Sequence, residues 1–228
     1  MGEELEILKM VCRRLKERGV SYMITGSVAA NFYAVPRMTR DIDIVVEVQK
    51  GDADRLLTIF KDDFYIDREA VLQAIDTQGM FNVIHNESVM KVDLIIRKDS
   101  SYRALEFERR RPLEIEGVTM WVVSPEDLIL SKLFWAKESE SEIQFMGDTS
   151  PRVISKMREM MQQKSAGERL KMGCSMYDFS RQLVTHSVLQ RNPQLSQNAL
   201  REEIFLRFYG NAFDRDQQQK IVKYLTSR

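Results

Sequence analysis

Apolar residues in the first 145 positions recur with two periods, which predict two kinds of element. Short runs rich in Val and Ile are typical of strands, and apolar residues at every third or fourth position are typical of amphipathic helices. Strands are expected at 20–25, 41–48, 79–85 and 88–97 and as a hairpin within 112–123. Helices are expected at 5–15, 27–35, 51–62, 67–75 and 124–138, and 102–111 is either a short helix or an irregular basic stretch. The pattern predicts an α/β fold of the α+β type, with a mixed β-sheet and flanking helices.

From residue 146 onward the pattern is helical. Apolar residues at helical spacing recur in 153–164, 167–190, 197–210 and 216–225. The sequence GDTSP at 147–151 is a polar cluster with Gly and Pro, of the kind that lies between domains. We therefore expect two domains, an α/β domain at 1–145 and an all-α C-terminal segment at 146–228, each with its own core.

Composition narrows the class of protein. The chain has 228 residues, 43% of them apolar and 30% charged, and its formal net charge is zero. No overall field therefore attracts nucleic acid or an anionic membrane. The two cysteines lie far apart in helical patterns, which argues against a disulfide framework. Because we find neither a long apolar run nor a signal-peptide start, we expect a cytoplasmic protein with no membrane contact.

The run DIDIVV at 41–46 places two acids in an apolar strand. Asp41 and Asp43 alternate with Ile residues, so both carboxylates lie on one face, where they repel each other and lose hydration. Asp93, in KVDLII, is a third acid in another apolar strand. Hard divalent cations such as Mg²⁺ prefer these oxygen ligands and leave room for phosphate oxygens. We expect Mg²⁺ to bind here, and two such ions can stabilise an in-line phosphoryl displacement.

Gly26-Ser27 ends a predicted strand and opens a predicted helix. Free backbone N–H groups and the helix dipole favour a phosphate at such a point, Gly permits close approach, and Ser adds a hydroxyl donor. Arg37, Thr39 and Arg40 come just before the aspartates, where they can touch phosphate or fix the carboxylates.

With these residues the chain resembles the nucleotidyltransferase superfamily of DNA polymerase beta. The family pattern is an apolar strand, Gly-Gly or Gly-Ser, a short helix, Asp-x-Asp and a third Asp on a later strand, here MITGS, RDIDIVV and KVDLII. Together with SPEDLILSKLFWAK, the pattern is most similar to small prokaryotic nucleotidyltransferases that include abortive-infection toxins. The resemblance covers about 1–145, whereas relatives continue with more helix of the same domain.

The resemblance implies roles for individual residues. It assigns both metal ions to Asp41 and Asp43, and the catalytic ion also to Asp93. These three aspartates are therefore the expected catalytic residues, and Gly26 and Ser27 would hold the triphosphate. Lys132 matches a position where relatives carry a basic residue toward the nucleotide. Arg40 is expected to bind the nucleotide because it comes just before the aspartates.

Structural interpretations remain open beside the functional ones. Asp41 and Asp43 also fit an exposed edge strand, where charged side chains discourage aggregation. Asp93 also fits a strand residue that forms a salt bridge. Lys132 fits a solvated helix lysine equally well, and Arg37 and Arg40 fit a role as counter-ions of the aspartates.

The sequence thus predicts a Mg²⁺-dependent nucleotidyltransferase that moves NMP from an NTP to an acceptor hydroxyl and releases pyrophosphate. The acceptor is an RNA, a protein or a small molecule. The alternative is a catalytically inactive module that binds a nucleotide or a partner, as part of a toxin–antitoxin system fused into one chain. In that case the C-terminal helices would bind the protein partner or cover the cleft.

Overall fold

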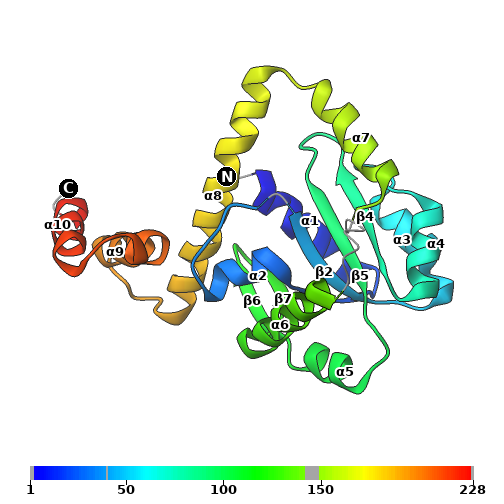
Figure 1. The fold of residues 1–228 in the computed structure, drawn as a ribbon, viewed down its shortest axis with the longest axis horizontal. Coiled ribbons are helices and arrows are strands. Elements are labelled where there is room, and N and C mark those ends of the chain that lie inside the picture. Colours follow the sequence, from blue (N-terminus) through cyan, green and yellow to red (C-terminus); the bar gives the residue numbers. More distant parts are fainter. Residues whose placement is uncertain (1–2, 40, 142–148, 227–228) are drawn as a thin grey trace.

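The computed structural model describes residues 3–39, 41–141 and 149–226, without the side chains of 135–141. Within these residues seven strands form one mixed sheet in the order β3-β4-β5-β2-β1-β7-β6 (Figure 1). Their bounds are Ser21–Ile24 (β1), Asp41–Glu47 (β2), Phe64–Tyr65 (β3), Met80–His85 (β4), Lys91–Ile96 (β5), Arg111–Ile115 (β6) and Val118–Val122 (β7).

Strand β2 lies at the centre of the sheet, between one antiparallel and one parallel neighbour. It runs antiparallel to β1 and parallel to β5. In the parallel pair Asp43 lies opposite Asp93, and Asp41 lies opposite Lys91. Because side chains alternate along a strand, this register places the three acids and the lysine on the same face.

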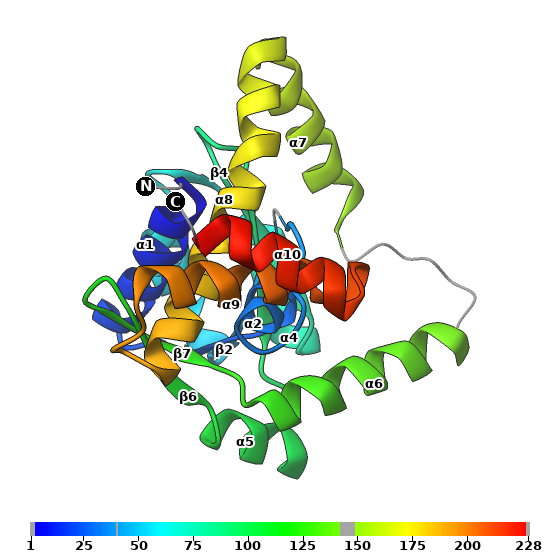
Figure 2. The same ribbon diagram turned by 90° about the vertical axis from the view of Figure 1, so that its left-hand side faces the viewer.

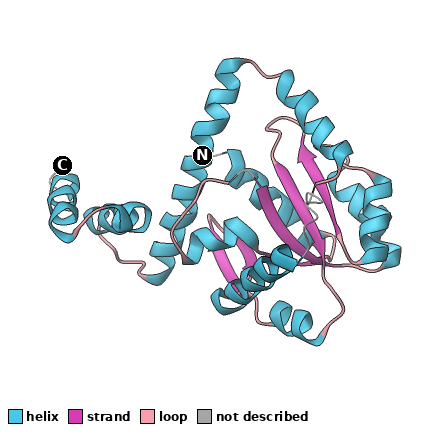
Figure 3. Ribbon diagram, in the orientation of Figure 1, coloured by secondary structure: helices cyan, strands magenta, loops and turns pink. Residues whose placement is uncertain are grey.

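The helices of the described residues flank this sheet and continue beyond it (Figure 3). Those before the C-terminal segment are Glu3–Glu17 (α1), Gly26–Tyr33 (α2), Ala53–Phe60 (α3), Arg68–Thr77 (α4), Ser101–Glu108 (α5) and Pro125–Ser141 (α6). The helices of the C-terminal segment are Pro151–Gln162 (α7), Ala166–Arg191 (α8), Gln197–Tyr209 (α9) and Arg215–Thr226 (α10). None of the helices in the described residues is long and apolar enough to cross a membrane.

One large core holds the sheet and its helices together. The inner face of α1 contributes Leu5, Leu8 and Leu15, all fully buried. Phe179 and Leu183 of α8 belong to the same core and are also fully buried. The helical segment therefore supplies side chains to the core of the α/β region.

The C-terminal helices differ in how they are attached (Figure 2). Val153 and Met160 of α7 pack with Ile84 and Val89 beside the outer strands. Next, α8 packs along α1 and α2, whereas α9 contacts α8 and α10 contacts α9. The boundary between 145 and 146 falls in 142–148, outside the described residues, and stays a prediction.

The predicted α/β class is confirmed, with a mixed sheet followed by helices. Residues 102–111 prove to be mainly helix, as α5 covers Ser101–Glu108 and β6 begins at Arg111. Strand β3 was not predicted, because a strand of two residues is too short to show a period.

Candidate functional site

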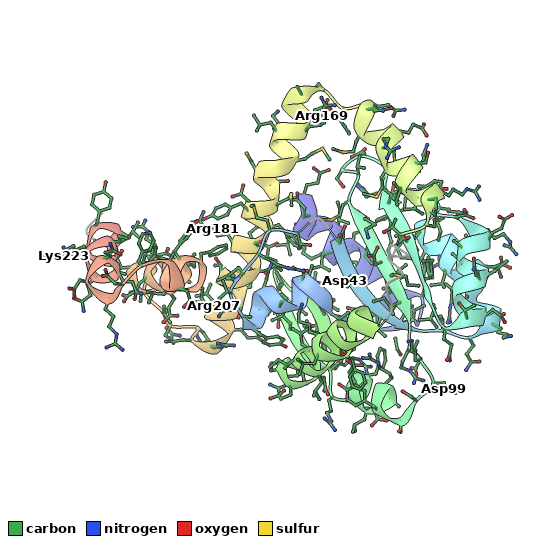
Figure 4. All side chains as sticks on the ribbon, in the orientation of Figure 1. Asp43, Asp99, Arg169, Arg181, Arg207 and Lys223 are labelled. Atoms are coloured by element: carbon green, nitrogen blue, oxygen red, sulfur yellow. The ribbon has the colours of Figure 1, made fainter. Side chains whose placement is uncertain are left out.

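Two carboxylates from adjacent parallel strands lie at the centre of the candidate site. Asp43 of β2 and Asp93 of β5 are register partners, and Asp93 is only 5% exposed (Figure 4 labels Asp43). The Asp41 side chain lies at the start of β2 and is half exposed. The predicted acidic face is therefore present, with Asp43 and Asp93 in its interior.

Gly26 packs directly against the Asp43 carboxylate at the start of α2. Its φ is +62°, in the left-handed region, and a Cβ built there would lie 2.8 Å from the Asp43 Cβ and closer still to a carboxylate oxygen. The next residue, Ser27, donates its backbone N–H to Asp43 Oδ2 over 3.4 Å. Only Gly fits both the conformation and the space at this position. The turn predicted to receive phosphate thus lies against a predicted metal ligand.

Arg37 extends the site from the loop between α2 and β2. Its Nε donates to Ser27 Oγ over 3.1 Å, and a second guanidinium nitrogen also donates to that oxygen. Thr39 fixes the start of β2, because its Oγ accepts from Asp41 N over 3.2 Å. Arg40 lies outside the described residues.

Lys91 supplies a positive charge among the carboxylates. Its side chain is 9% exposed, and its Nζ lies 2.7 Å from Asp93 Oδ2 and 3.8 Å from Asp41 Oδ1. It also donates to Thr149 Oγ over 3.1 Å, so the residues just before α7 touch the site. Asn82 of β4 donates to the other oxygen of Asp93 over 2.8 Å. Lys91 and Asn82 therefore donate hydrogen bonds to both oxygens of the Asp93 carboxylate.

Burial and like charge shift the ionisation of the aspartates. Burial and then the charge of Asp93 raise the pKa of Asp43 to about 6, although the Ser27 N–H opposes this. Burial likewise raises the pKa of Asp93, against the charge and hydrogen bond of Lys91. Burial alone would lower the pKa of Lys91, but the surrounding carboxylates outweigh it and raise that pKa. Two carboxylates with raised pKa values in a cavity are typical of a functional site.

A cavity of about 250 Å³ brings most of the predicted residues together. The members of the predicted site that line it are Gly26, Ser27, Arg37, Asp43, Asp93 and Lys132. Asp41 is not among its lining residues. A neighbouring cavity of about 220 Å³ shares Thr25, Met80, Ile95 and Ser131 with it and continues toward Arg103. Lys132 of α6 is exposed and lines the first cavity, of about 250 Å³, as a nucleotide contact requires.

The donor set is suited to Mg²⁺ bound together with a phosphate. Among the described residues no group of three His, Cys, Asp or Glu side chains is placed to hold a metal ion by itself. Mg²⁺, however, is usually bound by one or two carboxylates plus phosphate oxygens and waters. Asp43 and Asp93 could provide the two carboxylates, and Gly26 and Ser27 line the same cavity.

Sequence reasoning missed three residues of this site. Lys91 could have been found from the sequence, because the spacing Lys-x-Asp on a strand places Lys91 and Asp93 on one face. Asn82 and Thr149 give no such signal, because their positions depend on the pairing of β4 with β5 and on the path into α7.

Comparisons with solved structures find matches of low sequence identity and low TM-score. A candidate nucleotidyltransferase from Thermotoga maritima is 17% identical, with a TM-score of 0.45, and the match covers 71% of this chain and 94% of that one. An antigenic nucleotidyltransferase-like protein from Paracoccidioides brasiliensis is 18% identical, with a TM-score of 0.42 and coverage of 87% and 93%. The antibiotic-resistance factor ANT(2'')-Ia is 15% identical, with a TM-score of 0.39 and coverage of 85% and 98%. No curated protein sequence matches the chain.

Two family models match overlapping parts of the sequence. The model described as Rv0078B-related antitoxin matches residues 162–221, which include α8, α9 and part of α10. The other model matches residues 4–172, which include the sheet, the carboxylates and α7. Since this match spans most of the sequence, the chain belongs to the family of nucleotidyl transferases of unknown function (DUF2204).

Proposed function

We propose that the chain is a Mg²⁺-dependent nucleotidyltransferase that moves NMP from an NTP to an acceptor hydroxyl. The acceptor oxygen forms a bond to the α-phosphorus, the bond to the bridging oxygen of the β-phosphate breaks, and pyrophosphate leaves. The observation that carries the proposal is the single cavity that Gly26, Asp43 and Asp93 line together. The family supports the general class of reaction, while the metal, substrates and site roles are part of the proposal.

Each residue has a task that follows from its position. Gly26 lets the triphosphate approach the backbone, and Ser27 presents its N–H and hydroxyl. Arg37 and Lys132 are placed to pair with phosphate oxygens, since both line the cavity. Asp93, whose pKa is raised, is suited to accept the proton of the acceptor hydroxyl.

Asp43 and Asp93 would hold the metal, with Asp41 joining them in the two-metal arrangement. Bound Mg²⁺ would supply the positive charge that stabilises the entering and leaving oxygens. Asp41 Oδ1 faces Lys91 Nζ at 3.8 Å, so its participation requires the lysine to give up this contact.

Gly26 allows a matched test of the phosphate site. Gly26→Ala introduces a Cβ that collides with Asp43, whereas Gly19→Ala introduces one at a similar φ of +66° with nothing within 4 Å. Both variants carry the backbone strain, but only the first forces the Asp43 side chain out of its place beside the Gly26 turn. We expect Gly26→Ala to weaken Mg²⁺–NTP binding by about a hundredfold or more, as measured by titration calorimetry. Equal affinity in the two folded variants would move the phosphate site elsewhere.

Transfer itself is tested with Mg²⁺ and each NTP labelled at the α-phosphate. Label should pass to RNA, to protein or to a small acceptor such as an aminoglycoside, and an NTP labelled at the γ-phosphate should release labelled pyrophosphate. Label that remains in NTP throughout, despite Mg²⁺–NTP binding, would refute catalysis.

The second candidate function is an inactive module that binds a nucleotide or a partner, as part of a toxin–antitoxin system. The match of residues 162–221 to an antitoxin-related family favours it, and these helices would supply the surface for a protein partner. The predicted location in the cytoplasm stays a prediction.

A further inference from the structure

The loop between α2 and β2 carries Arg37 but buries few of its own side chains. Val35 is 56% exposed and Met38 is 58% exposed. Apolar packing therefore does little to fix the loop, and its conformation depends on hydrogen bonds to its backbone.

The first of these hydrogen-bonding residues is Asn31 of α2, which is fully buried. Its Oδ1 accepts from the backbone N–H of Arg37 over 3.0 Å, and its Nδ2 donates to the carbonyl of Arg37 over 3.2 Å. The side-chain amide thus pairs with both backbone groups of the one residue that points to Ser27.

The second residue is Ser180 of α8, which is also fully buried. Its Oγ lies 2.9 Å from the carbonyl oxygen of Arg37 and 3.1 Å from that of Met176, and its single hydrogen is shared between these two acceptors, of which Arg37 is the nearer. The same oxygen accepts from Asn31 Nδ2 over 3.3 Å. Ser180 and Arg37 are 143 positions apart. One hydroxyl therefore joins the C-terminal helices to the loop at the cavity.

A further contact joins these helices to the same end of α2. Arg207 of α9 donates to the carbonyl of Phe32 over 2.9 Å, and Figure 4 labels this arginine. The last carbonyls of a helix lack partners within it, so a guanidinium there stabilises the helix end from which the loop departs.

We propose that Ser180 is a positioning residue: from α8 it holds the backbone of Arg37, so that the guanidinium faces Ser27 and contributes to binding the triphosphate. The segment that matches the antitoxin-related family thereby supports the nucleotide site rather than closing it. This inference rests on the proposed function for its ligand, but the hydrogen bonds that carry it are independent of that ligand.

Ser180→Ala and Ser187→Ala form a matched pair of variants. Both hydroxyls belong to α8 and donate to backbone carbonyls of the α/β region. Ser187, however, donates to Phe32, whose carbonyl keeps Arg207 as a donor in Ser187→Ala, and it does not touch the loop. We expect Ser180→Ala to weaken Mg²⁺–NTP binding about fivefold relative to Ser187→Ala, the size of one hydrogen bond's net effect. Equal or tighter binding in Ser180→Ala would overturn the proposal.

A double-mutant cycle tests whether the effect passes through Arg37. Arg37→Gln removes the guanidinium, so adding Ser180→Ala should then cost no further NTP affinity. If the two effects add fully, Ser180 acts by another route and the proposal is wrong.

Proteolysis separates failure of this inference from failure of the proposed function. Arg37 is an exposed trypsin site in the free protein, so Ser180→Ala should raise the rate of cleavage after Arg37 several-fold over Ser187→Ala. Equal rates would overturn the positioning role whether or not the protein binds NTP. Faster cleavage in a protein that binds no NTP would retain the positioning role and refute the proposed function.

Discussion

The carboxylate face of the sheet buries charged side chains, whereas the far end of the C-terminal helices exposes apolar ones. Both regions depart from the usual distribution of side chains, in opposite directions. At the sheet, Asp43 and Asp93 bring like charges together in a largely buried place. On α9 and α10, large apolar side chains stay exposed, among them Tyr209 at 42% and Tyr224 at 57%. The cation and phosphate of the proposed function would relieve the first arrangement, and contact with another apolar surface would relieve the second. The two regions therefore differ in the chemistry of the ligand that each would accept.

Removing α8 to α10 should have the largest effect. A chain that stops after Gln163 loses Phe179 and Leu183 from the main core. Because two large buried side chains and the contacts of α8 with α1 and α2 are lost together, we expect no cooperative unfolding transition by circular dichroism. A cooperative transition in this fragment would support separate cores.

Asp43→Asn should lower the rate of NMP transfer about a thousandfold or more, because the site loses a proposed metal ligand. The measurement is transfer of α-phosphate label, with circular dichroism as the control for folding. Unchanged transfer in a folded variant would exclude Asp43 as a ligand.

The same variant should change how stability depends on pH. The pKa of Asp43 is raised to about 6 in the folded protein, from an ordinary value of 3.8. The folded state therefore holds a proton that the unfolded state loses, and the metal-free wild type loses stability as the pH rises from about 4 to 6. Asp43→Asn should remove this loss and exceed the wild type by up to about 3 kcal/mol at pH 7, but not at pH 3.5. Urea unfolding at the two pH values measures the difference.

Lys91→Met should alter metal binding by about tenfold. Without the ammonium, Asp93 and Asp41 lose their internal partner, so Mn²⁺ should bind more tightly and the metal-free protein should unfold more readily. Lys50→Met is the matched control, since it removes an exposed lysine–carboxylate pair with Asp76. Weaker Mn²⁺ binding in Lys91→Met would show that the lysine supports the metal rather than competes with it.

The smallest effect is expected from removing α10 alone. No residue of α10 is buried, so a chain that stops after Asp214 should lose less than about 1 kcal/mol of unfolding free energy. A larger loss would show that the outer helices stabilise the fold, and that their exposed side chains are not spare binding surface.

Residues close in sequence were the ones that could be predicted. The acidic face of β2 follows from the alternation of Asp and Ile, and Gly26-Ser27 from the strand-to-helix turn. Side chains such as these are placed by the period of their own element. The pairing of Asp43 with Asp93 depends in addition on the parallel arrangement of β2 and β5, which that period does not determine.

Contacts set by packing between distant elements could not be predicted. The bond from Ser180 to Arg37 depends on the rotation of α8 about its axis, which no local pattern determines. The participation of α8 in the main core was hidden for the same reason, because its apolar residues predict a buried face but not its partner.

The sharing of one polypeptide by α8 and the sheet has a consequence for regulation. Segments joined by a short linker meet at an effective concentration in the millimolar range, and their stoichiometry is fixed at one to one. Neither dilution nor unequal synthesis can separate them. Any control over the contact between α8 and the loop of Arg37 must therefore act by conformational competition or by cutting the chain, not by changing the supply of one component.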